Sequence, residues 1–259
     1  METSQTPEIT LYRAFPWQGQ YTWSPFVTKL ETRLRFAGIS YRTESGSPLS
    51  SPRGKVPYVD IRDRTTGATT TISDSALITK QLVEDGLVPD SNADLEPEKK
   101  VLDAGVRAIL EDRFYFLMSH EKWIENYYEM RKHVLHAFSY PAQVALGYFI
   151  YRKRAQMLYE QGTMRFTAEE LKGFKEEVWR YLNALLVSQK AKQAGDEPFW
   201  VLGGEHPTEA DACLFGFVVG ALICSACPET QAIVKSHPVV VEYAQRIHER
   251  FFPDYVYWE

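Results

Sequence analysis

Residues 55–78 read KVPYVDIRDRTTGATTTISDSALI, and this stretch decides how the first third of the chain folds. Residues 58–62 and 69–72 are rich in β-prone side chains, and the polar segment between them contains Gly67, which is typical of a hairpin. From Ser75 to Glu84 the apolar residues recur at helical spacing. The stretch therefore predicts two antiparallel strands followed by a helix.

The residues before this stretch alternate between strand and helix patterns. Residues 9–12 predict a short strand, residues 26–37 an amphipathic helix that stops at Gly38, and residues 39–43 a second strand. A loop rich in Ser, Pro and Gly spans residues 45–55. The order β-α-β-loop-β-β-α predicts a thioredoxin-like α/β domain over residues 1–88, with a mixed sheet covered by helices.

The remainder of the chain is predicted to be an all-helical domain over residues 98–259. Residues 86–97 are polar and contain two prolines, so we expect a linker there. Helical patterns follow, separated by proline or glycine. The expected helices cover residues 98–127, 140–161, 167–192, 209–226 and 238–250.

Charge and composition exclude several functions. The formal net charge is -5, from 29 basic and 34 acidic residues without long runs of one sign, so nucleic acid is not an expected partner. Residues 1–10 lack the pattern of a secretory signal, which favours a cytoplasmic location. The longest apolar run, residues 212–227, falls short of the ~20 residues that cross a bilayer, so no membrane contact is expected.

Three cysteines, Cys213, Cys224 and Cys227, lie within that apolar run. Cys224 and Cys227 have redox-motif spacing, but they end an apolar segment instead of following a strand at the start of a helix. We therefore interpret them as buried small hydrophobes. A thiol-disulfide reductase built on this pair would require both side chains to be exposed beside the first domain.

Ser24 precedes Pro25 at the start of the first predicted helix. Proline suits a first helical turn, and the serine hydroxyl is expected to cap it. The same helix end would stabilise a thiolate, so a bound thiol beside Ser24 would have a lowered pKa. The preceding loop is long, which leaves Tyr12 and Tyr21 as alternatives to Ser24 at the sulfur.

Two further sites follow from local chemistry. Pro57 must begin its strand because it lacks an N–H, and a cis Val56–Pro57 bond would expose the backbone of Val56 to a peptide. Asp74 and Ser75 begin a helix, where a hydroxyl and unpaired N–H groups form a carboxylate site and Asp74 can receive an ammonium group. By contrast, Thr208 and Asp211 form a capping box that we expect to be structural.

Histidines and aromatic residues give weaker signals. His120, His133 and His136 lack a further ligand at a suitable position, so we predict no metal site. Aromatic side chains crowd the first helix of the second domain, and any that face the first domain would line a pocket for a flat apolar molecule. They are Phe114, Tyr115, Phe116, Trp123, Tyr127 and Tyr128.

These motifs stand in the order and approximate spacing found in the glutathione transferase superfamily, which the chain resembles over nearly its whole length. Three segments are similar to the branch that includes failed-axon-connections proteins and metaxins. They are residues 24–39 (SPFVTKLETRLRFAGI), 51–58 (SPRGKVPY) and 246–253 (RIHERFFP).

The resemblance implies a glutathione site on the first domain. Val56 would bind the cysteinyl backbone, with Pro57 in cis, and Lys55 would contact the glycyl carboxylate. Asp74 and Ser75 would hold the γ-glutamyl end. Ser24 falls where related enzymes place the residue that meets the sulfur, and the absence of Cys there argues against a glutaredoxin-like reductase.

The leading functional hypothesis is a glutathione-dependent enzyme whose bound thiolate attacks a small apolar electrophile. Release of the adduct would make it a transferase, and collapse after bond rotation would make it a cis-trans isomerase, for instance of a metabolite in a biosynthetic pathway. A non-catalytic, metaxin-like binding module is the alternative. The resemblance also implies a homodimer.

Overall fold

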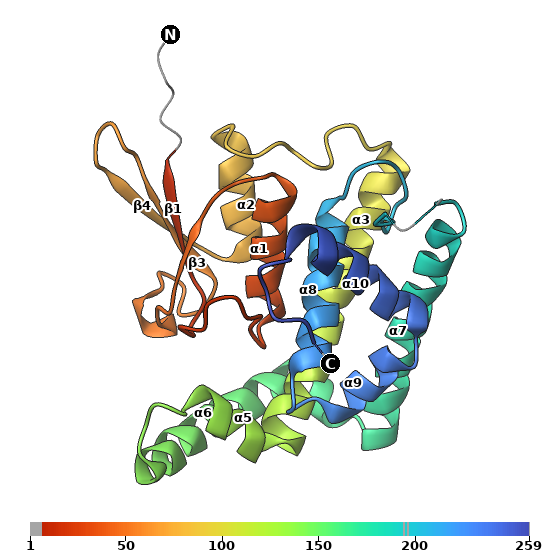
Figure 1. Cartoon of the computed structure of the whole chain (residues 1–259). Helices are drawn as coiled ribbons and strands as arrows, with labels where there is room; N and C mark the ends of the chain where they lie inside the picture. Colours follow the sequence, from red (N-terminus) through yellow and green to blue (C-terminus); the bar gives the residue numbers. More distant parts are fainter. Residues whose placement is uncertain (1–6, 194, 196, 259) are drawn as a thin grey trace.

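The computed structural model describes residues 7–193, 195 and 197–258. It consists of a small α/β domain and a larger helical domain, joined by the extended segment between α2 and α3 (Figure 1). The fold class predicted from the sequence, a thioredoxin-like domain followed by an all-helical domain, is confirmed.

The first domain contains a four-stranded sheet in the order β2-β1-β3-β4. Strand β1 (Glu8–Tyr12) runs parallel to β2 (Arg42–Glu44) and antiparallel to β3 (Tyr58–Arg62), which forms a hairpin with β4 (Thr69–Ser73). Helices α1 (Pro25–Phe36) and α2 (Ser75–Glu84) pack on one face. Their shared core contains Ile9, Leu11, Leu30, Leu34, Val59, Ile78 and Leu82.

Strand β2 begins three residues later than residues 39–43 predict. Gly38, just after the end of α1, has a positive φ of 65°, and the N–H of Ile39 bonds to the carbonyl of Leu34. This closure of the helix keeps Ile39 in the core as a loop residue. Strand pairing therefore starts at Arg42.

The second domain is helical throughout, apart from its connecting segments. Its main helices are α3 (Pro97–Ala108), α4 (Tyr115–His120), α5 (Tyr127–Val134), α6 (Tyr140–Gln161), α7 (Ala168–Lys190), α8 (Glu209–Ile223), α9 (Pro228–Lys235) and α10 (Pro238–Phe251). Short helical turns occur at η1 (Pro48–Ser50) in the first domain and at η4 (Thr163–Arg165).

The prediction of one continuous helix over residues 98–127 is wrong in its continuity and in its end. Two π-helical turns, η2 (Ile109–Phe114) and η3 (Glu121–Glu125), interrupt it, and the helical path continues to Val134. Helix α9 was also not expected. It exists because Pro228 opens a helix whose N–H groups at Glu229 and Thr230 bond to the Glu121 carboxylate, a contact between distant parts of the chain.

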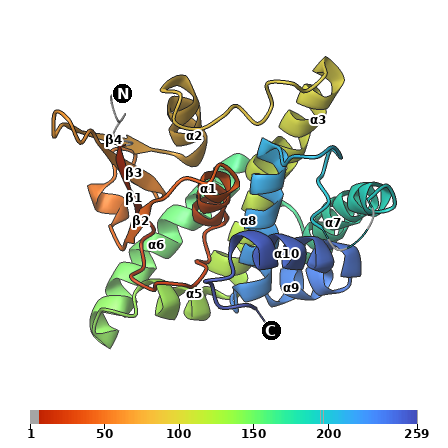
Figure 2. The ribbon, with the colours of Figure 1, turned by 45° about the horizontal axis from the view of Figure 1, so that its top comes forward.

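Helix α8 lies at the centre of the molecule and packs against α1 of the first domain (Figure 2). A Cβ at Gly216 would lie 2.5 Å from the carbonyl oxygen of Pro25, so glycine is needed for this close approach. In the part of the chain that the structure describes, no single helix is long and apolar enough to cross a bilayer. Helices α8 and α9 meet that length and composition only as a pair bent by 117°.

The C-terminal segment ties the first domain to the second. Tyr255 donates a hydrogen bond of 2.6 Å to Glu31 of α1, and Glu31 pairs with Arg13 at 3.4 Å, with all three side chains buried. The N–H of Val256 bonds to the carbonyl of Gly19 in the loop before α1. The β1–α1 loop is therefore fixed in place by the end of the chain.

Candidate functional site

Ser24 lies at the amino end of α1, with Pro25 in the first helical position. Its carbonyl accepts from the N–H groups of Val27 and Thr28, but its side chain makes no capping hydrogen bond, so the expected cap is wrong. The half-buried hydroxyl therefore stands beside the positive end of the helix without an internal partner among the described residues.

The bond between Val56 and Pro57 is cis, as the family resemblance implied. Pro57 accepts a 3.3 Å hydrogen bond from the N–H of Asp74, which brings the start of α2 beside it. Within the described residues, the N–H and C=O of Val56 have no backbone partner. An extended peptide could therefore pair with Val56.

Asp74 and Lys55 meet at the amino end of α2. One Asp74 oxygen accepts from the N–H groups of Ala76 and Leu77, and the other is 2.5 Å from Lys55 Nζ. Burial raises the pKa of the Asp74 carboxyl, but Lys55 and the two N–H groups outweigh burial and lower the pKa below its usual value. The carboxylate is therefore charged and can exchange one cation for another.

Two serines flank Asp74. Ser75 is buried at the first position of α2, and the buried hydroxyl of Ser73 has no hydrogen-bond partner in the described part of the chain. An unpaired buried hydroxyl is costly unless another polar group satisfies it. Together with the N–H groups at the start of α2, these hydroxyls can donate hydrogen bonds to a carboxylate.

Tyr12 lies away from this edge. Its neighbour Leu11 joins the core with α1, so strand alternation turns Tyr12 to the opposite face of the sheet. There it stacks on Tyr58 at 4.3 Å and donates a 2.9 Å hydrogen bond to Asp60. Burial and Asp60 raise the pKa of Tyr12 to about 12. The structure does not bring this phenol together with Ser24.

Tyr21 is an anchor in the core of the second domain. Its hydroxyl lies 2.8 Å from His248 Nδ1, and its ring packs against Phe215 and Tyr255. Burial raises the pKa of the phenol. Of the three hydroxyls considered from sequence, Ser24 alone stands at the end of α1.

An aromatic cluster connects the loop before Ser24 to α5, which the sequence did not indicate. Trp23 stacks on His133 with ring centroids 3.5 Å apart and planes 5° apart, and Phe15 and Trp17 contact the same imidazole. Burial lowers the pKa of His133 to about 4 and keeps the ring neutral. Among the described residues, no cluster of metal-ligating side chains forms here.

The aromatic residues of the second domain's first helical stretch have diverse positions. Phe114 and Trp123 are buried in the core of the second domain, whereas Tyr128 is exposed. Tyr115 contacts Phe26 of α1 with ring centroids 5.2 Å apart. Tyr115 is therefore a member of the predicted set that faces the first domain.

Lys122 is a buried cation that sequence reasoning missed. It lies on η3, and its Nζ donates a 2.9 Å hydrogen bond to the carbonyl of Trp23, next to Ser24. Its signal in the sequence was a lysine within an aromatic-rich helical stretch. Cys224 and Cys227 lie near it and are both buried, so the exposure required for a thiol-disulfide reductase is not met.

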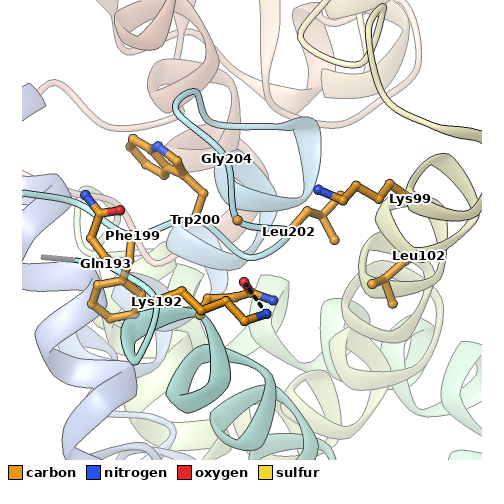
Figure 3. Close-up of a pocket in the computed structure, with 10 residues that line it drawn as sticks. Lys99, Leu102, Lys192, Gln193, Phe199, Trp200, Leu202 and Gly204 are labelled. Carbon is orange, nitrogen blue, oxygen red and sulfur yellow. Dashed lines mark hydrogen bonds between the residues drawn. The ribbon is translucent and has the colours of Figure 1, made fainter.

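A separate cavity of about 330 Å³ lies between α3, the end of α7 and residues 199–204 (Figure 3). Lys99, Lys192 and Phe199 are among its lining residues, and Lys192 bonds to Gln189. None of the site residues predicted from sequence lines this cavity. The candidate site is therefore the open edge at Val56 and Asp74, together with the end of α1.

Comparisons with known proteins show similarity in both sequence and fold. The family model of the glutathione S-transferase N-terminal domain matches residues 25–130, which extends beyond the first domain into α5. The chain is 24% identical to "Failed axon connections" of Drosophila melanogaster in an alignment of 258 positions that covers 90% of this chain. The chain spans only 55% of that protein's length.

Solved structures of similar fold carry bound glutathione. A glutathione transferase family member from Pseudomonas fluorescens, with two glutathione molecules bound, has a TM-score of 0.56 and 12% identity, covering 97% of this chain and 92% of that one. Maleylacetoacetate isomerase from Anaeromyxobacter dehalogenans, with glutathione in its active site, has a TM-score of 0.53 and 15% identity, covering 97% and 96%. The chain therefore has the glutathione transferase fold, and its sequence is similar to that of "Failed axon connections".

Proposed function

We propose that the chain binds glutathione along the edge at Val56 and presents its thiol to the amino end of α1. The observation that carries this proposal is the unpaired backbone of Val56 beside the open start of α2. The cysteinyl backbone of the tripeptide pairs with Val56. Its γ-glutamyl carboxylate then meets Ser75, and its ammonium group meets Asp74.

Lys55 has a second role in this binding mode. Because its Nζ already pairs with Asp74, the incoming ammonium group competes for the same carboxylate. The Lys55 side chain is 55% exposed, so it can turn to the glycyl carboxylate at little cost. Binding is thus an exchange of ion-pair partners.

The end of α1 supplies the activation of the thiol. A free thiol has a pKa of ~8.5, so only a small fraction is thiolate at neutral pH. The helix end and the Ser24 hydroxyl both favour the anion, and a lowering of two units corresponds to about 2.7 kcal/mol. The thiolate then attacks an electron-poor carbon of a small apolar electrophile.

Both outcomes of that attack remain within the proposal. Departure of the adduct completes a transfer, whereas collapse after rotation regenerates glutathione and completes an isomerisation. The bound glutathione in the similar isomerase structure supports the second outcome as well as the first. Tyr115 and Phe26 offer apolar surface at the domain junction for the electrophile.

A non-catalytic binding module is the second candidate. The observation that favours it is the stack of Trp23 on His133, because these aromatic rings already occupy part of the junction between the β1–α1 loop and α5. The similarity to "Failed axon connections" supports it too. In that case the first domain would have the glutathione transferase fold but would catalyse no reaction.

Calorimetry with glutathione separates the two candidates. We expect binding by the wild type and at least a tenfold loss of affinity in Ser75→Ala, because the γ-glutamyl carboxylate loses a donor. Ser139→Ala is the control, since Ser139 stands at the start of a different helix, α6, and makes no capping hydrogen bond there. Absence of binding by the wild type would remove the enzyme proposal and leave the module.

Ultraviolet titration of the bound thiol tests Ser24. We expect Ser24→Ala to raise the pKa of the bound thiol, because the anion loses a hydrogen-bond donor. Tyr12→Phe serves as the comparison, since the phenol already donates to Asp60. A raised pKa in Tyr12→Phe with no change in Ser24→Ala would transfer the role to Tyr12.

A further inference from the structure

The cavity of about 330 Å³ lies between three parts of the second domain, α3, the end of α7 and residues 199–204 (Figure 3). Sites for small molecules typically measure ~300–1,000 Å³, so its size suits a small ligand. Lys99 and Leu102 come from α3, and Lys192 follows the end of α7. None of the residues assigned to glutathione lines this cavity, so a ligand here would occupy a separate site.

The wall formed by residues 199–204 is largely apolar and is held in place by the rest of the domain. Its buried lining residues are Phe199, Trp200 and Leu202. Within this wall, the N–H of Val201 bonds at 2.8 Å to the carboxylate of Asp211, which is itself fully buried. A ligand would therefore meet a wall that is already formed, which lowers the ordering cost of binding.

Helix α3 supplies apolar surface on the other side of the cavity. Figure 3 shows Leu102 across the cavity from Phe199, and Leu102 is 44% exposed. An apolar group between these two side chains would remove the exposed part of Leu102 from water, which favours binding.

Two lysines bring positive charge to the cavity without a matching acid. Lys99 extends from α3 toward residues 202–204, and Lys192 Nζ lies 3.4 Å from Gln189 Oε1 (Figure 3). Within the described residues, neither ammonium group pairs with a carboxylate, and no carboxylate lines the cavity. The charge of the lining therefore favours an anion.

The uncharged polar groups of the lining add further donors. Gln189 Oε1 accepts from Lys192, and Gln189 Nε2 has no acceptor among the described residues. In the same part of the chain, the N–H groups of Leu202 and Gly204 make no hydrogen bond. Gly203 allows this wall to approach Gln189, because a Cβ there would lie 2.8 Å from Oε1. Donors without acceptors suit a ligand that only accepts hydrogen bonds, such as a carboxylate.

We propose that this cavity binds a small organic carboxylate with an apolar ring or chain. The carboxylate lies between Lys99 and Lys192, and the apolar part lies against Leu102 and Phe199. Ion pairs with exposed lysines contribute little by themselves, so a bare inorganic anion is not the ligand. The burial of an apolar group supplies the remaining affinity.

Calorimetry of the whole chain with naphthoate tests the class of ligand. We expect one equivalent to bind, and naphthylmethanol, which has the same rings without the charge, to bind at least tenfold more weakly. Inorganic phosphate should show no measurable binding at millimolar concentration. Equal affinity for naphthoate and naphthylmethanol would overturn the role of the lysines, and equal affinity for naphthoate and phosphate would overturn the role of the apolar wall.

Variants of the lysines locate the site. Lys99→Met and Lys192→Met should each weaken naphthoate binding by about three- to tenfold, and arginine at either position should largely restore it. Lys100→Met is the matched control, because it removes the same charge one position along α3. Lys100 is also exposed, but its Nζ donates to the carbonyl of Ala93 at 3.0 Å and does not line the cavity.

Three results would overturn the proposal. One is a wild-type chain that binds no naphthoate at millimolar concentration. Another is unchanged affinity in the double variant Lys99→Met/Lys192→Met, which would place the ligand elsewhere, for instance at the domain junction. The third is an equal loss in Lys100→Met, which would mean that naphthoate responds only to the overall charge of the surface.

The outcome can be separated from that of the proposed function. Saturating glutathione should leave the affinity for naphthoate unchanged, because Asp74 and Ser75 do not line this cavity. Competition between the two would place naphthoate at the start of α2 and overturn the cavity proposal. A chain that binds no glutathione, but binds naphthoate in a manner that depends on Lys99 and Lys192, would refute the proposed function alone.

Discussion

Helices α2 and α8 each have an aspartate that caps the amino end, Asp74 as the N-cap of α2 and Asp211 in the capping box of α8, yet the two carboxylates differ in how many of their hydrogen bonds the protein supplies. Asp211 at the start of α8 is fully buried and accepts from Val201 N, Tyr243 OH, Thr208 N and Thr208 Oγ1. Asp74 at the start of α2 is 26% exposed and accepts from two N–H groups and from Lys55. The hydrogen-bonding capacity of Asp211 is fully used inside the protein, whereas Asp74 can exchange Lys55 for another cation.

This difference separates a structural cap from a binding site better than residue type does. A carboxylate whose every lone pair is used by the protein has nothing left for a ligand. Asp74 pairs with a solvent-exposed lysine, and unpaired groups at Ser73 and Val56 lie in the same region. The four predictions that follow test this contrast between α8 and α2.

The largest effect is expected for Asp211→Ala compared with Asp74→Ala. Removing Asp211 strands several buried donors, so we expect a loss of about 3–5 kcal/mol in unfolding free energy. Removing Asp74 costs about 1 kcal/mol, as for an ordinary exposed cap. Urea unfolding of both variants measures the difference in unfolding free energy. Equal losses would mean that Asp211 is no more important to stability than Asp74.

The two caps should also respond to pH in opposite directions. Burial raises the pKa of Asp211 to about 6, so the folded chain keeps a proton that the unfolded chain releases above its ordinary pKa of ~3.9. Stability from Asp211 therefore falls as pH rises from about 4 to about 6, by at most about 3 kcal/mol. The pKa of Asp74 is lowered, so its contribution is present above that ordinary value and is lost as pH falls.

Unfolding of the wild type, Asp211→Asn and Asp74→Asn across this pH range separates the two contributions. Asp211→Asn should flatten the decline between about pH 4 and pH 6. Asp74→Asn should leave that decline intact and reduce the loss of stability at lower pH. An unchanged profile in Asp211→Asn would show that Asp211 does not titrate in this window.

Gly216→Ala tests whether the side of α8 that faces α1 is packed too tightly to admit a methyl group. The new methyl group would meet backbone atoms of Pro25 and Lys29 at 2.5 and 2.9 Å, so we expect a loss of about 1–3 kcal/mol. Gly220→Ala is the matched control, because its nearest neighbours lie at 3.7 Å or more. Thermal unfolding compares them, and similar midpoints would mean that α1 can retreat from α8.

The smallest stability effect is expected for Lys55→Met. Its ion pair with Asp74 is exposed, so the unfolding free energy should change by less than about 1 kcal/mol. Affinity for glutathione should nevertheless fall several-fold, since the glycyl carboxylate loses its cation. Chemical unfolding and calorimetry on one preparation measure both, and a loss of stability without a loss of affinity would make Lys55 a structural residue.

Local signals explain which parts of the structure the sequence could predict. The hairpin at residues 58–73 and the capping box at Thr208 depend on neighbouring residues or on one short motif. Lys55 and Asp74 are 19 residues apart, and only the family resemblance placed them in one site. The position of Tyr12 could also have been found, because strand alternation after the apolar Leu11 turns it from the core.

Long-range contacts explain the rest. Trp23 and His133 are far apart in sequence, and no pattern in either segment indicates that their rings stack. Helix α9 depends on a hydrogen bond to Glu121. The charged group of Lys122 is buried only because η3 packs against the α8–α9 turn. The π-helical turns that orient Glu121 and Lys122 leave no mark in apolar periodicity.

Helix α1 belongs to two cores at once, since one side packs on the sheet and the other on α8. Two buried cations of α1 form ion pairs with the second domain, Lys29 with Glu111 of η2 and Arg33 with Glu209 of α8. Limited proteolysis within the connector between α2 and α3 should therefore yield two fragments that elute together and melt in one cooperative transition. We therefore expect the two domains to unfold as a single cooperative unit.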